Sequence, residues 1–294
     1  MHTWDDPDLT AWEAAGQTHQ LAGHDIFAVD LPPSGAETLE PLVIVHGYPT
    51  SSYDFAALAP ALREHRRVVL VDLLGYGLSA KPDIHYTLAL QADIVMALTA
   101  ALGIDRLALL THDMGDTVGG ELLARQAEGA WPVEITRRVV TNGSIYIEMA
   151  HLTAGQQMLL SLPDEQLPAD LAPGRDAVAH SLVATLAPTH ADVDMNAHAK
   201  LIVHEGGNRI LARTIRYIEE RRANERRFTG AIESHPSPVT IVWGPEDPIA
   251  IAPMAERLQG VRPDATLRWI DGAGHYPQLE EPDAYLDALR DALG

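Results

Sequence analysis

The most constraining feature of the sequence is a buried strand pattern that runs directly into a helix pattern around residue 113. The stretch is LALLTHDMGDTVGG, residues 107–120, with Asp113 at the junction. Small residues two positions before and after a polar residue are typical of a sharp strand-to-helix turn that lifts the central side chain above a sheet. Thr111 departs from the glycine that usually opens such a turn. The alternative is an ordinary helix with Asp113 as its N-cap.

Strand and helix patterns alternate along most of the 294 residues, which predicts an α/β fold with a mostly parallel sheet flanked by helices. A hairpin is expected at Thr18–Asp30. Further strands are expected at Leu42–Val45, Arg67–Val71, Leu107–Leu110, Val133–Thr141, Val239–Trp243 and Thr266–Ile270. Helices are expected at Ser51–Arg63, Thr87–Leu102, Met114–Glu128, Pro253–Leu258 and Ala284–Leu293.

The alternation stops between residues 144 and 230, where no buried strand pattern occurs and prolines interrupt helical segments. An all-helical stretch between the sixth and seventh strand patterns is typical of an inserted cap. We therefore predict a core formed by residues 1–143 and 231–294, and a helical cap formed by residues 144–230.

A second motif, His46-Gly47-Tyr48-Pro49, follows the predicted strand Leu42–Val45. A strand that ends in this way can place a backbone N–H near the residue-113 turn. With the N–H that follows Asp113, it would form an oxyanion hole from the amides of Tyr48 and Met114. A simple turn that ends the strand is the alternative.

Two further motifs follow later strands. Asp247 comes just after the strand pattern Val239–Trp243, and His275 lies in a Gly-rich loop before the last helix. Taken alone, an Asp-Pro pair is usually a turn and a loop histidine is usually a surface residue. Glu246 is a rival for the acid, because it precedes Asp247 directly.

Together these motifs resemble the epoxide hydrolase and haloalkane dehalogenase branch of the α/β-hydrolases, especially the mesoderm-specific transcript proteins and their bacterial relatives. The matching segments are residues 46–54, 72–82, 112–116, 244–248 and 275–282. The resemblance implies an α/β-hydrolase fold with a cap. It also implies a catalytic triad of Asp113 as nucleophile, Asp247 as acid and His275 as base, in the order typical of the fold. It favours Asp247 over Glu246.

A carboxylate nucleophile limits the chemistry. Attack on an ester would only form an anhydride, whereas attack on an sp³ carbon opens an epoxide or displaces a halide. The resulting alkyl-enzyme ester would then be hydrolysed by water that His275 activates. No serine lies in a Gly-x-Ser-x-Gly context, so an esterase would lack its nucleophile.

The leaving group separates the two branches of the family. The dehalogenases commonly bind halide with Trp after the nucleophile and with Asn or a second Trp, but Met114 and Tyr48 occupy two of these positions. Residues 144–230 contain no Trp, but they contain Tyr146 and Tyr217, which could donate a proton to an epoxide oxygen. We predict an epoxide hydrolase that produces a vicinal diol. The alternatives are a haloalkane dehalogenase with the same triad, or a non-catalytic regulator with the same fold.

The composition limits the classes of molecule that the protein is expected to bind. The net charge of −20 opposes binding to nucleic acid and to anionic membranes, and favours a neutral small-molecule substrate, with water as the second reactant. The chain has no cysteine, and its histidines show no metal-ligand spacing, so neither a metal nor a cofactor is predicted. The acidic N-terminus lacks the apolar core of a signal peptide, which predicts a cytoplasmic location.

Overall fold

The computed structural model describes residue 2 and residues 4–294. Its centre is an eight-stranded sheet with the order β1-β2-β4-β3-β5-β6-β7-β8. The strands from β3 to β8 run parallel, and β2 pairs antiparallel with both β1 and β4. The strands are β1 Gly16–Leu21, β2 His24–Leu31, β3 Leu42–Val45, β4 Val68–Val71, β5 Arg106–His112, β6 Glu134–Thr141, β7 Val239–Trp243 and β8 Thr266–Trp269.

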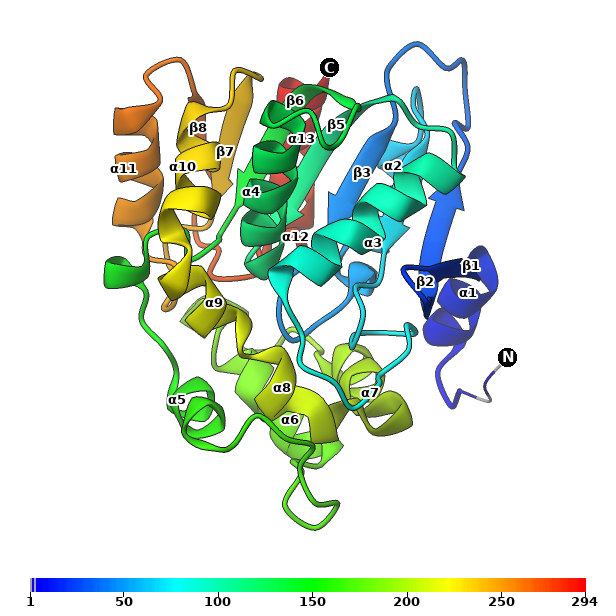
Figure 1. Ribbon diagram of the computed structural model, residues 1–294, viewed down its shortest axis with the longest axis vertical. Helices are drawn as coiled ribbons and strands as arrows, with labels where there is room; N and C mark the ends of the chain where they lie inside the picture. Colours follow the sequence, from blue (N-terminus) through cyan, green and yellow to red (C-terminus); the bar gives the residue numbers. More distant parts are fainter. Residues whose placement is uncertain (1, 3) are drawn as a thin grey trace.

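Helices cover both faces of this sheet (Figure 1). They are α1 Pro7–Ala15, α2 Ala59–Leu62, α3 Leu88–Ala101, α4 Met114–Ala127, α5 Ala154–Ser161, α6 Arg175–Val183, α7 Asn196–Val203, α8 Leu211–Thr214, α9 Tyr217–Ala223, α10 Glu225–Ser234, α11 Ala252–Val261, α12 Pro277–Glu280 and α13 Pro282–Leu293. The predicted fold class is confirmed.

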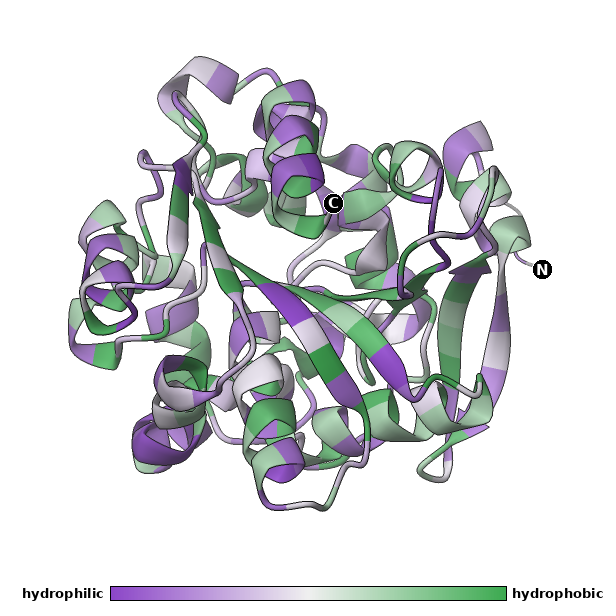
Figure 2. Cartoon of the chain, turned by 90° about the horizontal axis from the view of Figure 1, so that it is seen from above, coloured by the Kyte–Doolittle hydropathy of each residue, from purple (hydrophilic) through white to green (hydrophobic). Residues whose placement is uncertain are grey.

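The central strands are buried on both faces, because successive side chains of a strand point in opposite directions. In β3, Val43 and Val45 join the apolar cluster that includes α3, α4 and α11. Leu42 and Ile44 join the opposite cluster, which includes α1, α2 and α13. Figure 2 shows the result as largely hydrophobic strands between helices of mixed colour.

Only helical elements occur between β6 and β7 in the structure. Helices α5 to α8 lie beyond the carboxyl ends of the parallel strands, whereas α10 lies beside α4 in the layer that covers the sheet (Figure 1). This close approach depends on Gly120 of α4, since a Cβ there would lie 2.6 Å from the backbone oxygen of Phe228 in α10. The helical insertion therefore ends with an element that packs as part of the core.

Two local features differ from the expectations. The single helix expected at Ser51–Arg63 is a 3₁₀ turn at Ser52–Phe55 followed by the short α2. The side chain of Asp72 accepts hydrogen bonds from the amide and hydroxyl of Ser52, at 2.9 and 2.5 Å, and holds the chain in this turn. The N-terminal helix α1 was not anticipated, although Asp6 caps it and Pro7 opens it.

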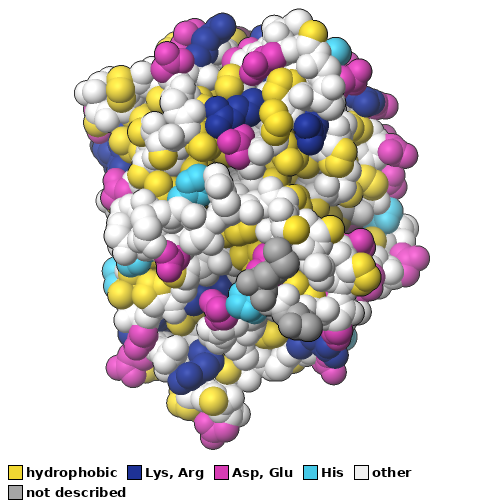
Figure 3. All heavy atoms as spheres, turned by 90° about the vertical axis from the view of Figure 1, so that its right-hand side faces the viewer, with side chains coloured by type: hydrophobic (Ala, Val, Ile, Leu, Met, Phe, Trp, Pro, Cys, Tyr) yellow, Lys and Arg dark blue, Asp and Glu magenta, His cyan; other side chains and the backbone are white. Residues whose placement is uncertain are grey.

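No helix in residues 4–294 is long and apolar enough to cross a membrane. On the face shown in Figure 3, the acidic side chains are scattered among basic and hydrophobic ones, without a single dominant patch. The acidic side chains of this face are thus distributed over it rather than gathered at one place.

The contact between α4 and α10 can be tested with a matched pair of glycine substitutions. Gly120→Ala should lower the free energy of unfolding by about 1–3 kcal/mol, because its Cβ overlaps the Phe228 backbone. Gly230→Ala, inside α10 with open space around its Cβ, should raise that free energy by up to about 1 kcal/mol. Urea unfolding measures both, and equal effects would contradict the packing described.

Candidate active site

Asp113 occupies a strained turn between β5 and α4, with φ 51° and ψ −117°. Non-glycine residues rarely adopt positive φ, and the surrounding structure must compensate for the strain. Gly115 allows the turn, because a Cβ there would lie 2.3 Å from the Val45 carbonyl oxygen. Thr111 fits where a glycine is usual because it faces Gly119, whose added Cβ would lie 3.0 Å from Thr111 Cγ2.

The loop after β3 brings a backbone donor to Asp113. The Tyr48 N–H donates to Asp113 Oδ2 at 2.8 Å. Gly47 is essential to this approach, because a Cβ at that position would lie 2.5 Å from Asp113 Cβ. Met114 is the first residue of α4, where N–H groups have no intrahelical acceptor. The two amides proposed for an oxyanion hole therefore come from the two segments that adjoin Asp113.

His275 lies between the two predicted carboxylates. Its Nδ1 donates to Asp247 Oδ2 at 2.8 Å, and its Nε2 lies 3.8 Å from Asp113 Oδ1. All three side chains are buried. The structure thus brings together Asp113, Asp247 and His275 from loops that follow β5, β7 and β8.

Asp247 is held by several donors, whereas its neighbour Glu246 is exposed. Its Oδ1 accepts from the amides of Ile249 and Ala250, at 2.7 and 3.0 Å, and its Oδ2 accepts from Asn142 Nδ2 at 2.8 Å. These bonds fix the carboxylate that orients the imidazole of His275. Position and hydrogen bonding therefore favour Asp247 over Glu246.

The environment of His275 favours its protonated form. Burial opposes the charge, but the Asp247 carboxylate and its hydrogen bond, together with Asp113, raise the pKa of His275 to about 9. The imidazole is therefore cationic at neutral pH while Asp113 carries its charge. Loss of the Asp113 charge would lower this pKa.

Tyrosines surround Asp113, but the two predicted proton donors occupy different places. The Tyr217 ring lies 5.6 Å from the Tyr48 ring, and burial together with the charge of Asp113 raises the pKa of Tyr217 well above its usual range. Tyr146 is elsewhere: its hydroxyl donates to Glu233 at 2.8 Å, and Arg257 covers its ring. The structure thus brings Tyr217 beside Tyr48, whereas it turns the Tyr146 hydroxyl toward Glu233.

Three residues next to Asp113, Asp247 and His275 were not identified from the sequence. Asn142 bridges Asp247, Gly244 and Gly274; its position at the end of β6 and before a glycine was the available signal. His112 donates from Nε2 to the His275 carbonyl at 2.8 Å, and burial lowers the pKa of His112 to about 4. Tyr76 directs its hydroxyl to the Met114 sulfur at 3.4 Å.

A buried acid, Asp54, also lies near the triad. It accepts from the Thr50 hydroxyl at 2.6 Å, and burial raises the pKa of Asp54 well above its usual range. His198 of α7 lies 3.4 Å from its other oxygen. This contact joins the helical insertion to the core through residues that sequence patterns did not single out.

A cavity of about 220 Å³ leads to the triad. Tyr48, His275 and Tyr276 form its inner end, and residues of α5 and α6 form much of its wall. Asp113 does not line the cavity itself, but it contacts two residues that do, Tyr48 and His275. Among the described residues, no Asp, Glu, Lys or Arg contributes to the lining, so the cavity suits an uncharged, largely apolar group.

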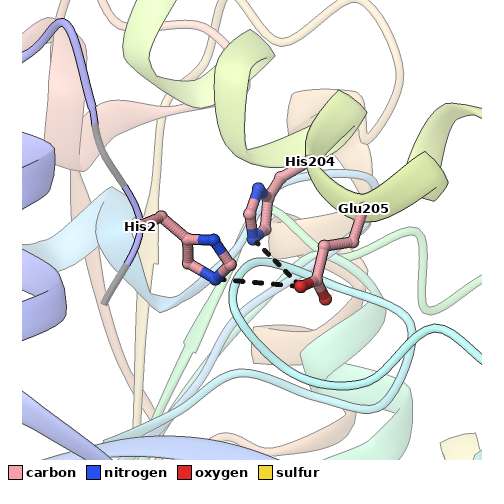
Figure 4. Close-up of side chains that lie close together, drawn as sticks. All are labelled: His2, His204 and Glu205. Atoms are coloured by element: carbon pink, nitrogen blue, oxygen red, sulfur yellow. Dashed lines mark ion pairs between the residues drawn. The ribbon is translucent and has the colours of Figure 1, made fainter.

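A separate histidine cluster lies where the N-terminal segment meets the insertion (Figure 4). His2 and His204 each place Nε2 within 3.8–3.9 Å of Glu205 Oε1. Burial and the positive charge of the nearby Lys81 lower the pKa of His204 to about 4. The distances are those of loose ion pairs, and the cationic Lys81 opposes a metal ion, so we assign no ion to the cluster.

Comparison with known proteins places this geometry in a family. Residues 40–282 match the family described as the alpha/beta hydrolase fold. The chain belongs to this family. It is 35% identical to the protein LipZ of Mycobacterium tuberculosis over 98% of both chains, and 33% identical to the human mesoderm-specific transcript homolog protein over 96% of this chain and 87% of that protein. The predicted family is confirmed.

More limited similarities extend the comparison. A haloalkane dehalogenase of Agrobacterium fabrum is 36% identical over 131 residues, which are 42% of this chain and 43% of that protein. The crystal structure of Cfl2 from Burkholderia cenocepacia superposes with a TM-score of 0.76 over 95% of both chains, at 24% identity, and so supports the fold. The chain is therefore a hydrolase of the α/β-hydrolase superfamily.

The charge of Asp113 should control the titration of His275. Asp113→Asn removes one of the two carboxylates that face the imidazole, so the pKa of His275 should fall below its value of about 9. Titration of the imidazole by NMR measures this change. The control Glu246→Gln removes a charge from an exposed neighbour of Asp247 and should leave the pKa unaltered. An unchanged pKa in Asp113→Asn would show that Asp113 does not interact with His275.

Proposed function

We propose that the protein is an epoxide hydrolase that uses Asp113 as its nucleophile, Asp247 as its acid and His275 as its base. The observation that carries this proposal is the two-sided placement of the Asp113 carboxylate. One oxygen accepts the Tyr48 N–H at 2.8 Å, and the other faces His275 Nε2 at 3.8 Å. This arrangement supports a carboxylate that forms an ester and then loses it to water.

In the first half-reaction, Asp113 Oδ1 attacks an epoxide carbon from the side opposite the C–O bond. That bond breaks, its electron pair moves to the epoxide oxygen, and a proton from a nearby acid converts the alkoxide into a hydroxyl. Asp113 Oδ2 remains beside the Tyr48 amide as the carbonyl oxygen of the new ester. Tyr217, buried next to Tyr48, is the proton donor we assign.

In the second half-reaction, the neutral ester no longer raises the pKa of His275, so the imidazole can lose its proton and act as a base. It takes a proton from a water that attacks Asp113 Cγ. Negative charge develops on Oδ2, where the Tyr48 and Met114 amides stabilise it. In the collapse of this intermediate the Cγ–Oδ1 bond breaks, and the leaving alkoxide takes the proton held by His275 to complete the diol. The proton lost by the new carboxyl group balances the one that Tyr217 donated, so that the Asp113 carboxylate and the Tyr217 hydroxyl are both restored.

A haloalkane dehalogenase is the second candidate, and the partial identity to such an enzyme favours it. Halide needs N–H donors rather than a proton. The side chains at the corresponding positions are those of Tyr48 and Met114, and tyrosines rather than tryptophans approach Asp113. This composition supports the epoxide. The apolar cavity and the net charge of −20 support a substrate whose main part is neutral.

The nucleophile can be tested by a single turnover in ¹⁸O-labelled water. Because water attacks Cγ of the ester, label should enter the peptide that carries Asp113, as read by mass spectrometry. Label found only in the diol after one turnover would mean that water attacks the epoxide directly.

The base can be tested with His275→Gln. This variant should form the alkyl-enzyme and accumulate it, since the base acts only in the second half-reaction.

The proton donor can be tested with two tyrosine variants. Tyr217→Phe should slow epoxide opening by a factor on the order of 10²–10⁴, the range typical of a lost general acid. Tyr146→Phe makes the same change at a hydroxyl that pairs with Glu233, and should leave the rate of opening near that of the parent. Stopped-flow measurement of ester formation gives both rates. Halide release from a 1-haloalkane faster than diol formation would favour the dehalogenase.

A further inference from the structure

A second, smaller cavity adjoins the one that leads to the triad. It has a volume of about 90 Å³ and lies among α5, α9 and the segments that follow β6 and β7. Gln156 and Ile249 line both cavities, and Tyr217 lines the smaller one. We call this space the side chamber. Its walls place it next to the apolar cavity and next to the residue assigned as proton donor.

The side chamber differs from the main cavity because a buried cation lines it. Arg221 is 2% exposed, and its Nη1 donates to the Ser144 carbonyl at 2.6 Å. Its guanidinium carbon lies 5.0 Å from the centre of the Tyr217 ring. Beyond a weak contact of the guanidinium with the Tyr217 hydroxyl, its Nε and Nη2 have no hydrogen-bond acceptor among the described residues. A buried guanidinium with unsatisfied donors is costly unless an anion or water completes it.

The buried acid Asp116 interacts with the charge of Arg221 but does not accept a hydrogen bond from its Nε or Nη2. Asp116 senses the charge of Arg221, yet it lies in α4 with its Oδ1 bonded to the Thr111 hydroxyl. Burial raises the pKa of Asp116 well above its usual range despite that nearby cation. Within the described part of the chain, no Asp or Glu lines the side chamber, so the chamber itself offers Arg221 no carboxylate partner.

We propose that the side chamber binds a compact monovalent anion, either a free halide or carboxylate ion or the carboxylate group of a substrate. A volume of about 90 Å³ equals the liquid-phase share of roughly three water molecules, which suits a halide or a carboxylate group. The anion would accept hydrogen bonds from Arg221 Nε and Nη2 beside Tyr217. A substrate carboxylate there would leave the rest of the molecule in the apolar cavity.

Free anions are tested on the resting protein, without any assumption about its reaction. Bromide and formate should each raise the melting temperature of the parent saturably. Arg221→Gln should weaken this binding at least tenfold. The control Arg226→Gln makes the same change in charge at an exposed position of α10 and should bind these anions as the parent does.

Crystals of the parent protein soaked in sodium bromide provide a readout that does not depend on the folding of the variant. An anomalous bromine peak in the side chamber supports the free-anion source.

The substrate source is tested with an epoxide that carries a terminal carboxylate and with its methyl ester. This arm rests on the proposed function. A KM that is lower for the acid than for the ester, with the difference lost in Arg221→Gln, supports a substrate carboxylate. Absence of bromide from the chamber, together with no Arg221-dependent preference for the acid, would overturn the proposal. If neither epoxide is hydrolysed, the proposed function fails, and the bromide and formate experiments alone decide the anion site.

Discussion

The strained backbone at Asp113 is the constraint on which the rest of the site depends. A residue with φ 51° between a buried strand and a helix persists only if its surroundings hold it there. Parallel pairing of β5 with β3 and β6 provides that support. The absence of side chains at Gly47 and Gly115 lets the β3 loop come close enough for the Tyr48 amide to reach Asp113. The same turn that strains Asp113 therefore also supplies its hydrogen-bond donor.

The buried carboxylates of this molecule differ in the hydrogen-bond donors that they receive. Asp247 receives hydrogen bonds from two backbone amides, an asparagine and an imidazole. Asp54 accepts from the Thr50 hydroxyl, and Asp116 accepts from the Thr111 hydroxyl and the Thr141 backbone, yet burial raises the pKa of both. His275 faces the Asp113 and Asp247 carboxylates, and their attraction for a positive charge raises the pKa of His275 although the imidazole is buried.

Local sequence patterns were sufficient to predict much of the fold and the proximity of Asp113, Asp247 and His275, because both depend on where strands end. In a parallel sheet the carboxyl ends of the strands meet at one edge, so Asp113, Asp247 and His275 could be brought together from their positions after strand patterns. The parallel strands needed only short apolar runs to be recognised. Helix α1 was missed because only Leu9 and Trp12 of its residues are buried, which gives a weak periodic signal.

Long-range packing of the insertion could not be predicted in this way. Tyr146 and Tyr217 look equivalent in the sequence, yet one hydroxyl turns to Glu233 and the other tyrosine packs on Tyr48. Arg221 lies in a run of charged residues that resembles a solvated helix face, but the start of the insertion covers it through the Ser144 carbonyl. Helix periodicity does not reveal which turn of a short helix another segment will bury.

Arg221 and Tyr217 lie four residues apart on one side of helix α9, and this placement has an electrostatic consequence. Arg221 opposes the effect of burial and of Asp113 on the pKa of Tyr217, and so makes its hydroxyl a better acid than burial alone would allow. In the proposed reaction Asp113 attacks carbon in a low-dielectric pocket, and such a pocket would otherwise hold a tyrosine proton too tightly. A cation behind the tyrosine reconciles these two requirements. Helix α9 thus places in the side chamber both the tyrosine proposed as the acid and the cation that makes this tyrosine more acidic.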